Sequence, residues 1–252
     1  MNIANEIARL QKAKADIKTV IENKGVTVGD GTIDSYAEKI KEIPVGGETE
    51  SENPFYYASR LDNVLGGVDF PENYEAVIKL KKAPKICNYL FNNSANLKTA
   101  KMISEDQTNT VEFAYAFRIS SNVPTLELVD LSKFNKKFST LQHAFSGQTK
   151  LKSILGTFDL SECTNNNNAF VNCNALEDIE FVPNTIKTNI YFTYSDKLTD
   201  KSIQSIFDGL ATVETAQTLT LPTNLKILQS QVDSANVKGW TVAGGTVVSE
   251  EE

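Results

Sequence analysis

Few residues of this 252-residue chain could do chemistry, and their spacing matches none of the common catalytic arrangements. Hydrolysis of a glycan requires two carboxylates that converge in a cleft, and Glu177, Asp178 and Glu180 are the candidates. Three acids on one short strand are more typical of a solvated face than of a catalytic pair. We therefore expect these carboxylates to lie at the surface without hydrolytic activity.

The cysteines and the histidine also lack the spacing that metal binding or nucleophilic catalysis needs. Cys87, Cys163 and Cys173 contain no metal-type pair, and the single His143 excludes a site built from several histidines. We expect three reduced, mostly buried thiols, because free cysteine packs as a small hydrophobe; a Cys163–Cys173 disulfide is the alternative. His143 precedes Phe145 by two residues in a recurring motif, and we interpret it as a position of that motif. The sequence predicts no enzyme, no metal and no cofactor.

Charge and hydropathy argue against two further classes of protein. The net charge is −7, but six glutamates, at 48, 50, 52 and 250–252, are clustered outside the predicted elements, and residues 1–43 balance seven basic against seven acidic residues. The remaining 19 acidic and 18 basic residues make a nearly neutral body, whereas nucleic-acid binding relies on clustered Lys and Arg. No window approaches the roughly 18 apolar residues of a membrane span, and the N-terminus lacks the apolar stretch of a secretory signal. We expect no nucleic-acid binding, no membrane insertion and no general export, unless a signal has been removed.

The first predicted element is a helix whose apolar residues follow the alternating spacing of a heptad. Its seam consists of Ile3, Ile7, Leu10, Ile17 and Ile21. Lys14 is the polar exception, and Gly25 ends the helix. Isoleucine at both seam positions favours a trimer over a dimer. We predict that this segment self-associates as a homotrimer; a helix packed on its own chain is the alternative.

A short strand, a second helix and a linker complete the N-terminal part. Residues 26–28 alternate like a strand, and residues 32–43 carry an amphipathic helical pattern after a glycine turn. Residues 46–54 combine two glycines, a proline and three glutamates, which is typical of a linker. We assign residues 1–45 to a helical oligomerisation or attachment segment and 46–54 to an acidic Gly/Pro linker.

From residue 55 onward the chain repeats a motif in which phenylalanine is followed six residues later by leucine. Four stretches match it: YLFNNSANL (89–97), HAFSGQTKL (143–151), NAFVNCNAL (168–176) and IYFTYSDKL (190–198). In a fifth copy, Phe117 is followed by a small insertion that displaces its leucine to Leu126 or Leu128. The five phenylalanines are separated by 26, 28, 25 and 22 residues. One such unit cannot bury its apolar side alone, so stacking should align Phe on Phe and Leu on Leu in a continuous core.

Each unit should place a short parallel strand on one side and a turn, or a single helical turn, on the other. Strand-like segments recur at 77–80, 126–128, 179–181 and 219–221. Outward side chains on these strands are the candidate ligand-facing residues, namely Lys79, Lys101, Glu127 and Glu180.

The C-terminal end departs from the period and should shield the open end of the ladder. It reads as a capped helix at 198–210, a strand at 218–221, a helix at about 223–235 and a strand at 238–245. We therefore divide the remaining chain into a repeat region at 55–197 and an αβαβ cap with an acidic tail at 198–252.

The repeats resemble the BspA-type leucine-rich repeats over roughly residues 75–225. That family's units carry Ala-Phe, a small residue three positions later, a leucine three beyond it, then x-x-Ile before a strand often closed by proline. The matching residues are Asn168-Ala169-Phe170, Cys173, Leu176, Ile179 and Pro183, with partial matches at 115–117 and 143–145. The resemblance implies an α/β solenoid, a BspA-like leucine-rich-repeat ladder with an N-terminal coiled-coil-like helical segment and a C-terminal αβ cap.

A second resemblance concerns the context of the protein. The stretches IANEIARLQKAKADIK, ENKGVTVGDGTIDSYAEKIKEI and LTDKSIQSIFDGLATVETAQTLTL look like segments of phage minor structural proteins from tails, baseplates or fibres. This resemblance implies a non-enzymatic virion protein, assembled in the host cytoplasm and attached to other virion proteins by its N-terminus. Its repeats would contact a host cell-surface protein or glycan. A bacterial surface adhesin with the same repeats and a purely architectural capsid or tail decoration protein are the alternatives.

Overall fold

The computed structural model describes residues 3–22, 27, 74–120 and 124–249, without the side chains of 3–10, 13, 20 and 74. The chain divides into two compact units, Met1–Glu50 and Ser51–Glu252. The predicted helix at 32–43, the linker at 46–54 and both ends of the predicted strand at 26–28 lie outside the described residues. No helix among the described residues is long and apolar enough to cross a membrane.

The described element of the first unit is α1 (Ile3–Glu22). The backbone of all five predicted seam residues lies in this helix, and the side chains of Ile3, Ile7 and Leu10 lie outside the description. The two remaining seam residues differ in environment, since Ile17 is 37% exposed and Ile21 only 2%. The trimer therefore stays a prediction.

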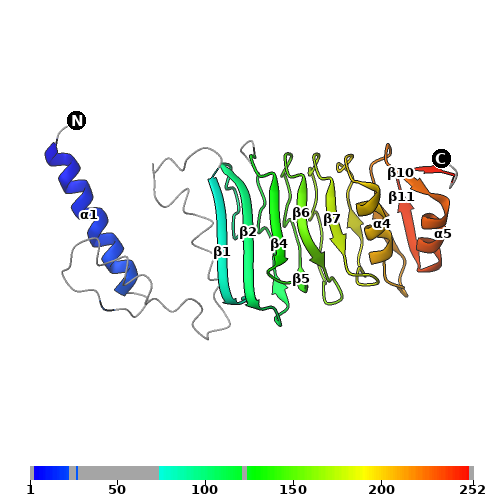
Figure 1. Cartoon of the computed structure of the whole chain (residues 1–252), viewed down its shortest axis with the longest axis horizontal. Coiled ribbons are helices and arrows are strands. Elements are labelled where there is room, and N and C mark those ends of the chain that lie inside the picture. The colour runs from blue at the N-terminus through cyan, green and yellow to red at the C-terminus, as the bar shows by residue number, and fades with distance from the viewer. Residues whose placement is uncertain (1–2, 23–26, 28–73, 121–123, 250–252) are drawn as a thin grey trace. The chain divides into compact units, whose positions relative to one another are not determined.

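The second unit is built around a sheet of five parallel strands that stand side by side in the order β1-β2-β4-β6-β7 (Figure 1). These strands are β1 (Tyr74–Lys82), β2 (Leu97–Asp106), β4 (Leu128–Lys133), β6 (Ser153–Phe158) and β7 (Asp178–Phe181). Each strand is paired with the equivalent strand of the next repeat, so sequence neighbours in this sheet are also spatial neighbours.

Shorter parallel strands pair in three smaller sheets elsewhere in the repeats and at the C-terminal end. They are β3 (Val111–Glu112) with β5 (Phe138–Thr140); β8 (Ile190–Tyr191), β9 (Gln217–Thr220) and β11 (Trp240–Ala243); and β10 (Lys226–Leu228) with β12 (Thr246–Val248). Two short helices, α4 (Asp200–Gly209) and α5 (Gln229–Val237), complete the described elements.

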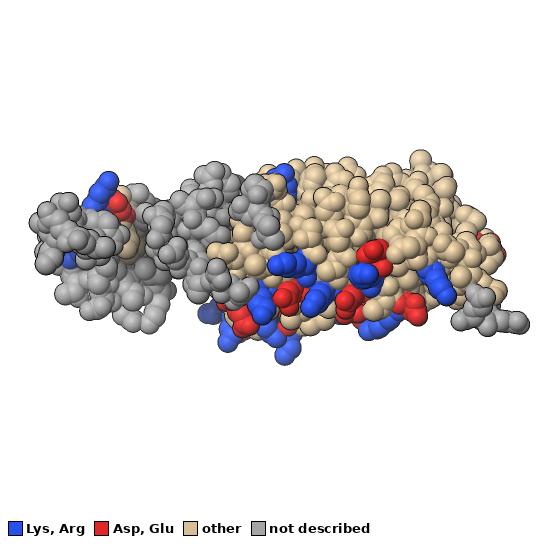
Figure 2. Space-filling model, turned by 90° about the horizontal axis from the view of Figure 1, so that it is seen from above, with Lys and Arg blue, Asp and Glu red and all other residues tan. Residues whose placement is uncertain are grey.

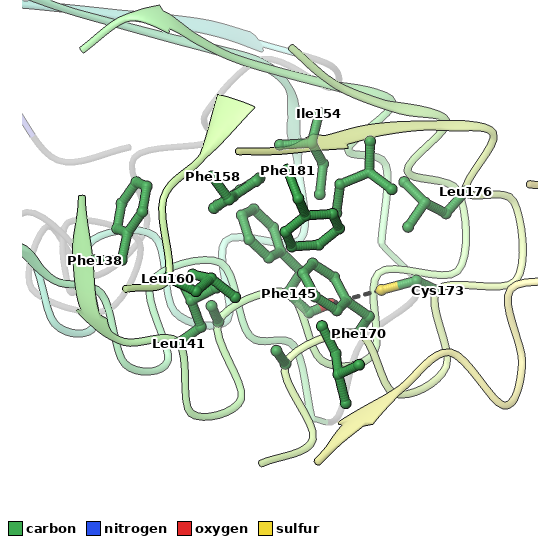
Figure 3. Close-up of a cluster of buried hydrophobic side chains, with 14 of the residues drawn as sticks. Phe138, Leu141, Phe145, Ile154, Phe158, Leu160, Phe170, Cys173, Leu176 and Phe181 are labelled. Atoms are coloured by element: carbon green, nitrogen blue, oxygen red, sulfur yellow. Dashed lines mark hydrogen bonds between the residues drawn. The ribbon is translucent and has the colours of Figure 1, made fainter. Parts of the chain in front are cut away.

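The five repeat phenylalanines stack on one another through the core, as the period predicts. The ring centroids of consecutive pairs from Phe91 through Phe117, Phe145 and Phe170 to Phe192 lie 5.3, 5.6, 5.7 and 4.9 Å apart. The repeat leucines are buried as well, and in the fifth copy Leu126, with no exposed surface, takes the core position. Figure 3 shows Phe145 and Phe170 with Cys173 and Leu176 in this core.

A second column of buried phenylalanine rings was not predicted from the sequence, because its members do not keep a constant spacing from the Phe-x5-Leu motif. Phe138 contacts Phe113 and Phe158 at 5.3 and 5.1 Å, and Phe158 contacts Phe181 at 5.8 Å between centroids. Phe158 also meets Phe145 and Phe170 edge to face. The two columns pack together with aliphatic side chains such as Ile154 and Leu160 in one hydrophobic core (Figure 3).

The turns on the far side of the repeats contain residues in the left-handed region of backbone space. Asn168 and Asn172, which flank Phe170, have φ angles of 55° and 59°. Asparagine tolerates this conformation better than most residues. At the position equivalent to Asn172, Gly147 has a φ of 85°, and a Cβ there would lie 2.2 Å from the carbonyl oxygen of Ile119.

The fold class predicted from the sequence is wrong. We expected an α/β solenoid, with a leucine-rich-repeat ladder between a helical N-terminal segment and an αβ cap, but the regular elements of the described residues are mainly parallel strands, with few helices. Helices are scarce because the connections are short turns interrupted by left-handed residues, whereas an α-helix needs consecutive right-handed ones. The C-terminal end also contains more strand than expected, since β10 and β12 are added and α5 begins only at Gln229.

Helix α4 lies beside β7 and supplies hydrogen-bond acceptors to that strand's free edge. The hydroxyl oxygen of Ser202 accepts from the backbone N–H of Ile179 at 3.0 Å, and that of Ser205 accepts from Phe181 at 2.9 Å. The helix is capped by Thr199, whose side chain accepts from the N–H of Ser202. Polar side chains of a helix thus replace the next strand, which satisfies an edge that could otherwise pair with another chain.

Candidate functional site: the outward face of the five-stranded sheet

Alternating side chains of the large sheet point into the core and away from it. In the inward row, Ala100, Val129 and Ile154 pair across β2, β4 and β6 and are at most 2% exposed. The neighbouring outward row joins Val77, Lys101, Asp130 and Leu155 across four strands. Val77 is 58% and Leu155 42% exposed. We call the solvent-exposed side of these strands the outward face.

The four ligand-facing candidates lie on or beside this face, but they do not form one cluster. Lys79 and Lys101 are on the neighbouring strands β1 and β2, in different rows of the ladder. Glu127 lies in the connection immediately before β4, and Glu180 lies on β7 at the other end of the sheet. The sheet thus spreads these charges across its width.

Three of the four candidates form ion pairs with residues from a neighbouring repeat. Lys101 Nζ lies 2.7 Å from Asp130 Oδ2, Lys152 Nζ lies 3.9 Å from Glu127, and Lys201 pairs with Glu180. Hydrogen bonding and attraction to Glu180 raise the pKa of Lys201. These partners were not predicted, because the spacing of a repeat alone does not fix which side chains face each other across strands.

Asp130 is the most buried charged group on the outward face, at 9% exposed. Burial alone would raise the pKa of its carboxyl group, but hydrogen bonds from Lys101 and from the side chain and backbone of Ser132 outweigh burial and lower it. The hydroxyl of Ser132 donates to Asp130 Oδ1 at 2.6 Å and its backbone N–H does so at 3.1 Å. Asp130 therefore fixes the ammonium group of Lys101 at one point of the face.

Charged side chains gather on one side of the second unit. Figure 2 shows Lys, Arg, Asp and Glu along one edge of the view from above, with little charge elsewhere on the visible surface. Four ion pairs of the described residues lie on or beside the sheet, namely Lys82–Asp106, Lys101–Asp130, Glu127–Lys152 and Glu180–Lys201. Both signs alternate along the face, which favours a partner of mixed charge over a polyanion.

The end of the face nearest α4 contains a small hollow of about 120 Å³. Its lining includes Leu155, Gly156, Asp178, Glu180 and Lys201. Gly156, with a φ of 110°, lies within the stretch where the register between β6 and β7 shifts, and a Cβ there would come within 2.9 Å of the backbone of Leu131. The hollow thus arises from a local irregularity of β6.

The acidic residues considered for hydrolysis take part in interactions of this surface. Asp178 Oδ2 accepts from the hydroxyl of Ser153 at 2.9 Å, and Glu180 pairs with Lys201. Glu177 is exposed, and its backbone oxygen accepts from the N–H of Thr199 at 3.0 Å. This arrangement joins β6, β7 and α4.

The cysteines and His143 lie away from the outward face. All three cysteines are free and buried, as predicted. Burial raises the pKa of each thiol, that of Cys173 to about 12. The ring of His143 stacks on Tyr115 at 5.1 Å between centroids, continuing a stack that begins with Tyr89. Among the described residues, no group of three or more His, Cys, Asp or Glu side chains could hold a metal ion.

The comparisons with family models, curated proteins and solved structures found no significant match to this chain.

Proposed function

We propose that the chain is a non-enzymatic phage virion protein, part of a tail fibre, a baseplate or a related appendage, that uses the outward face of its large sheet to contact the host surface. The resemblance of its N-terminal and C-terminal segments to phage minor structural proteins supports the virion context. Attachment to other virion proteins is proposed for the N-terminal segment, and self-association as a homotrimer for the seam of α1.

The outward row across β1, β2, β4 and β6 is the observation that carries the proposed contact. It combines two exposed apolar side chains, Val77 and Leu155, with a lysine held by a buried carboxylate. Apolar contacts beside pre-positioned charges are a common composition of recognition surfaces. Because neighbouring parallel strands hold these side chains at regular spacing, little ordering is needed on binding.

Binding of the full-length protein to cells tests this contact. We expect labelled protein to bind the surface of a susceptible bacterial host strain, and the double change Val77→Glu with Leu155→Glu to weaken binding by about tenfold or more. Both side chains are exposed, so these changes should leave the fold intact. Val237→Glu is the matched control, because Val237 is 86% exposed but lies on α5.

Two alternative functions give different results. A purely architectural capsid or tail protein would bind no cells, and its face variants would behave like the unchanged protein. A bacterial surface adhesin would bind animal-host or matrix components and would be encoded away from tail genes. We expect tail or capsid genes beside this one, and their absence would count against the virion context.

The N-terminal proposal has its own test. Light scattering of the full-length chain should give the mass of three copies, and Ile17→Asp together with Ile21→Asp should reduce it to that of one. A monomeric unchanged chain would contradict the trimer without affecting the proposed face.

A further inference from the structure

We propose that a second surface of this protein, a shallow hollow among its C-terminal repeats, binds a neutral sugar ring. The hollow has a volume of about 320 Å³, at the lower end of the about 300–1,000 Å³ typical of small-ligand sites. Three successive repeats line it: Asn174 from the first, Thr193, Tyr194 and Asp196 from the second, and residues 221–224 from the third. The hollow uses no residue of the outward face, so this inference does not depend on the function proposed above.

Tyr194 supplies a surface on which a sugar ring can stack. Its side chain is 47% exposed, and no aromatic ring stacks on it in the described part of the chain. In earlier repeats, by contrast, Tyr89 and Tyr115 lie face to face at 4.9 Å between centroids. The electron-rich face of a tyrosine attracts the weakly positive C–H groups on one side of a pyranose ring. Buried Leu221 and Pro222 extend the apolar part of the hollow.

Uncommitted polar groups surround this tyrosine. Asn174, Asp196, Thr223 and Asn224 are exposed, and their side chains make no hydrogen bond or ion pair with the described residues. Together they offer a carboxylate, which accepts hydrogen bonds, and two amides and a hydroxyl, which both donate and accept them. Neighbouring hydroxyls of a sugar also donate and accept, so they can satisfy several of these groups at once.

The charge of the lining selects among possible ligands. Asp196 is the single charged residue of the hollow. With a negative charge and no positive one nearby in the lining, a phosphate, a sulfate or an acidic sugar would be repelled. A neutral hexose or an N-acetylated hexosamine fits the combination of an exposed ring, amides and one carboxylate.

Hydrogen bonds hold the backbone of the 222–225 turn, which lines the hollow, in place. Pro222 O accepts from Leu225 N at 3.3 Å and from Gly245 N at 3.1 Å, and the hydroxyl of Thr246 donates to Thr223 O at 2.7 Å. These bonds fasten the 222–225 turn to the segment that forms β12. A ligand therefore meets a preformed surface, which reduces the entropic cost of binding.

Saturation-transfer NMR on the full-length protein tests the inference, with the methyl glycosides of glucose, galactose, mannose, N-acetylglucosamine and N-acetylgalactosamine at millimolar concentration as probes. We expect at least one of them to receive saturation, most strongly on the C–H groups of one ring face. Tyr194→Ala should weaken that binding by about tenfold or more, and Tyr194→Phe should largely preserve it, because stacking needs the ring and not the hydroxyl.

Two control variants show whether the sugar binds in this hollow or elsewhere on the protein. Tyr89→Ala, a change at a 38% exposed tyrosine outside the hollow, should leave sugar binding unchanged, as should the Val77→Glu and Leu155→Glu pair. If Tyr194→Ala fails to fold, Asp196→Ala serves in its place and should also weaken binding. No transfer to any probe, or transfer that survives the loss of Tyr194 or Asp196, would overturn the inference.

Discussion

At the scale of single residues, Cys173 is a packed part of the hydrophobic core. Its thiol donates to the carbonyl oxygen of Phe145 at 3.2 Å, and it has no exposed surface. Equivalent positions in other repeats hold polar side chains, and one of them does the same, since Gln148 donates to the carbonyl oxygen of Phe117. The absence of a metal-type spacing and the tendency of free cysteine to pack as a small hydrophobe were enough to predict a packing position in place of a reactive one.

Thiol reactivity tests this interpretation. Because burial raises the pKa of all three thiols, folded protein at pH 8 should react with an aromatic disulfide reagent at least about 100-fold more slowly than protein in concentrated guanidinium chloride. The number of thiols released in denaturant should match the three cysteines. One thiol that reacts equally fast in the folded and the unfolded chain would contradict the burial of that cysteine.

At the same scale, the environment of His143 leads us to expect that the free energy of unfolding depends on pH. Burial, followed by the positive charge of Arg118, lowers the pKa of this histidine. The unfolded chain therefore takes up a proton first as the pH falls through about 6.5, so the free energy of unfolding should decrease from there down to the lower pKa of the folded state. Below that pKa the contribution should be constant.

The comparison with His143→Gln isolates this effect from the carboxylates that titrate at lower pH. Urea unfolding between neutral and mildly acidic pH should show the decrease in the unchanged protein and a flatter profile in the variant. A profile of equal slope in both proteins would assign the dependence to other groups. The opposite slope would mean that folding favours the protonated ring.

At the scale of elements, the contact between α4 and β7 shows how the large sheet ends. Two serines one helical turn apart face the strand and accept its N–H groups. The sequence pattern predicted an amphipathic helix over residues 198–210, because Ile203, Ile206 and Leu210 recur at helical spacing. It did not show that Ser202 and Ser205 have this role, since serine in a helix is usually interpreted as a solvent-facing residue.

Replacing both serines by alanine should destabilise the second unit. Ile179 and Phe181 are at most 3% exposed, so their N–H groups would lose their acceptors in a buried setting. Each unsatisfied group costs about 1–3 kcal/mol, and we expect a decrease of roughly 2–6 kcal/mol in the free energy of unfolding for the pair. Ser234→Ala on the exposed side of α5 is the matched control and should change stability by less than about 0.5 kcal/mol. Equal effects of the two changes would remove the proposed role of the edge serines.

At the scale of the whole second unit, the phenylalanine column connects the repeats into one core. Phe170 has a ring on each side, with centroids 5.7 Å from Phe145 and 4.9 Å from Phe192, and it has no exposed surface. Phe170→Ala should lower the free energy of unfolding by about 3–5 kcal/mol, because it removes these contacts and leaves a cavity. Urea unfolding followed by circular dichroism measures the change.

A phenylalanine at another position of the same column provides the control for Phe170→Ala. Phe91, at 8% exposed, stacks on Phe117 at the first described position of the column. We expect Phe91→Ala to cost less than Phe170→Ala. A smaller loss at Phe170 than at Phe91 would mean that the repeats do not share a continuous core.

Much of the core could be predicted from the sequence alone. The spacing of Phe and Leu identified the stacking positions, because a repeated apolar side chain can be buried only by its copies in neighbouring repeats. The buried cysteines were predicted on a different ground, because free cysteine packs as a small hydrophobe. These features depend on local sequence and on a period, both of which are visible without coordinates.

The tertiary structure alone decided the fold class, the pairing across strands and the hollow near Tyr194. The sequence predicted turns or single helical turns between the strands, but it did not show which turn residues adopt the left-handed backbone that excludes helices there. The pairing of Lys101 with Asp130 depends on the register between β2 and β4. A constant period cannot predict that register, because the repeat that contains Phe117 has an insertion before Leu126. The hollow needs three separate repeats side by side, and only the folded chain brings those residues together.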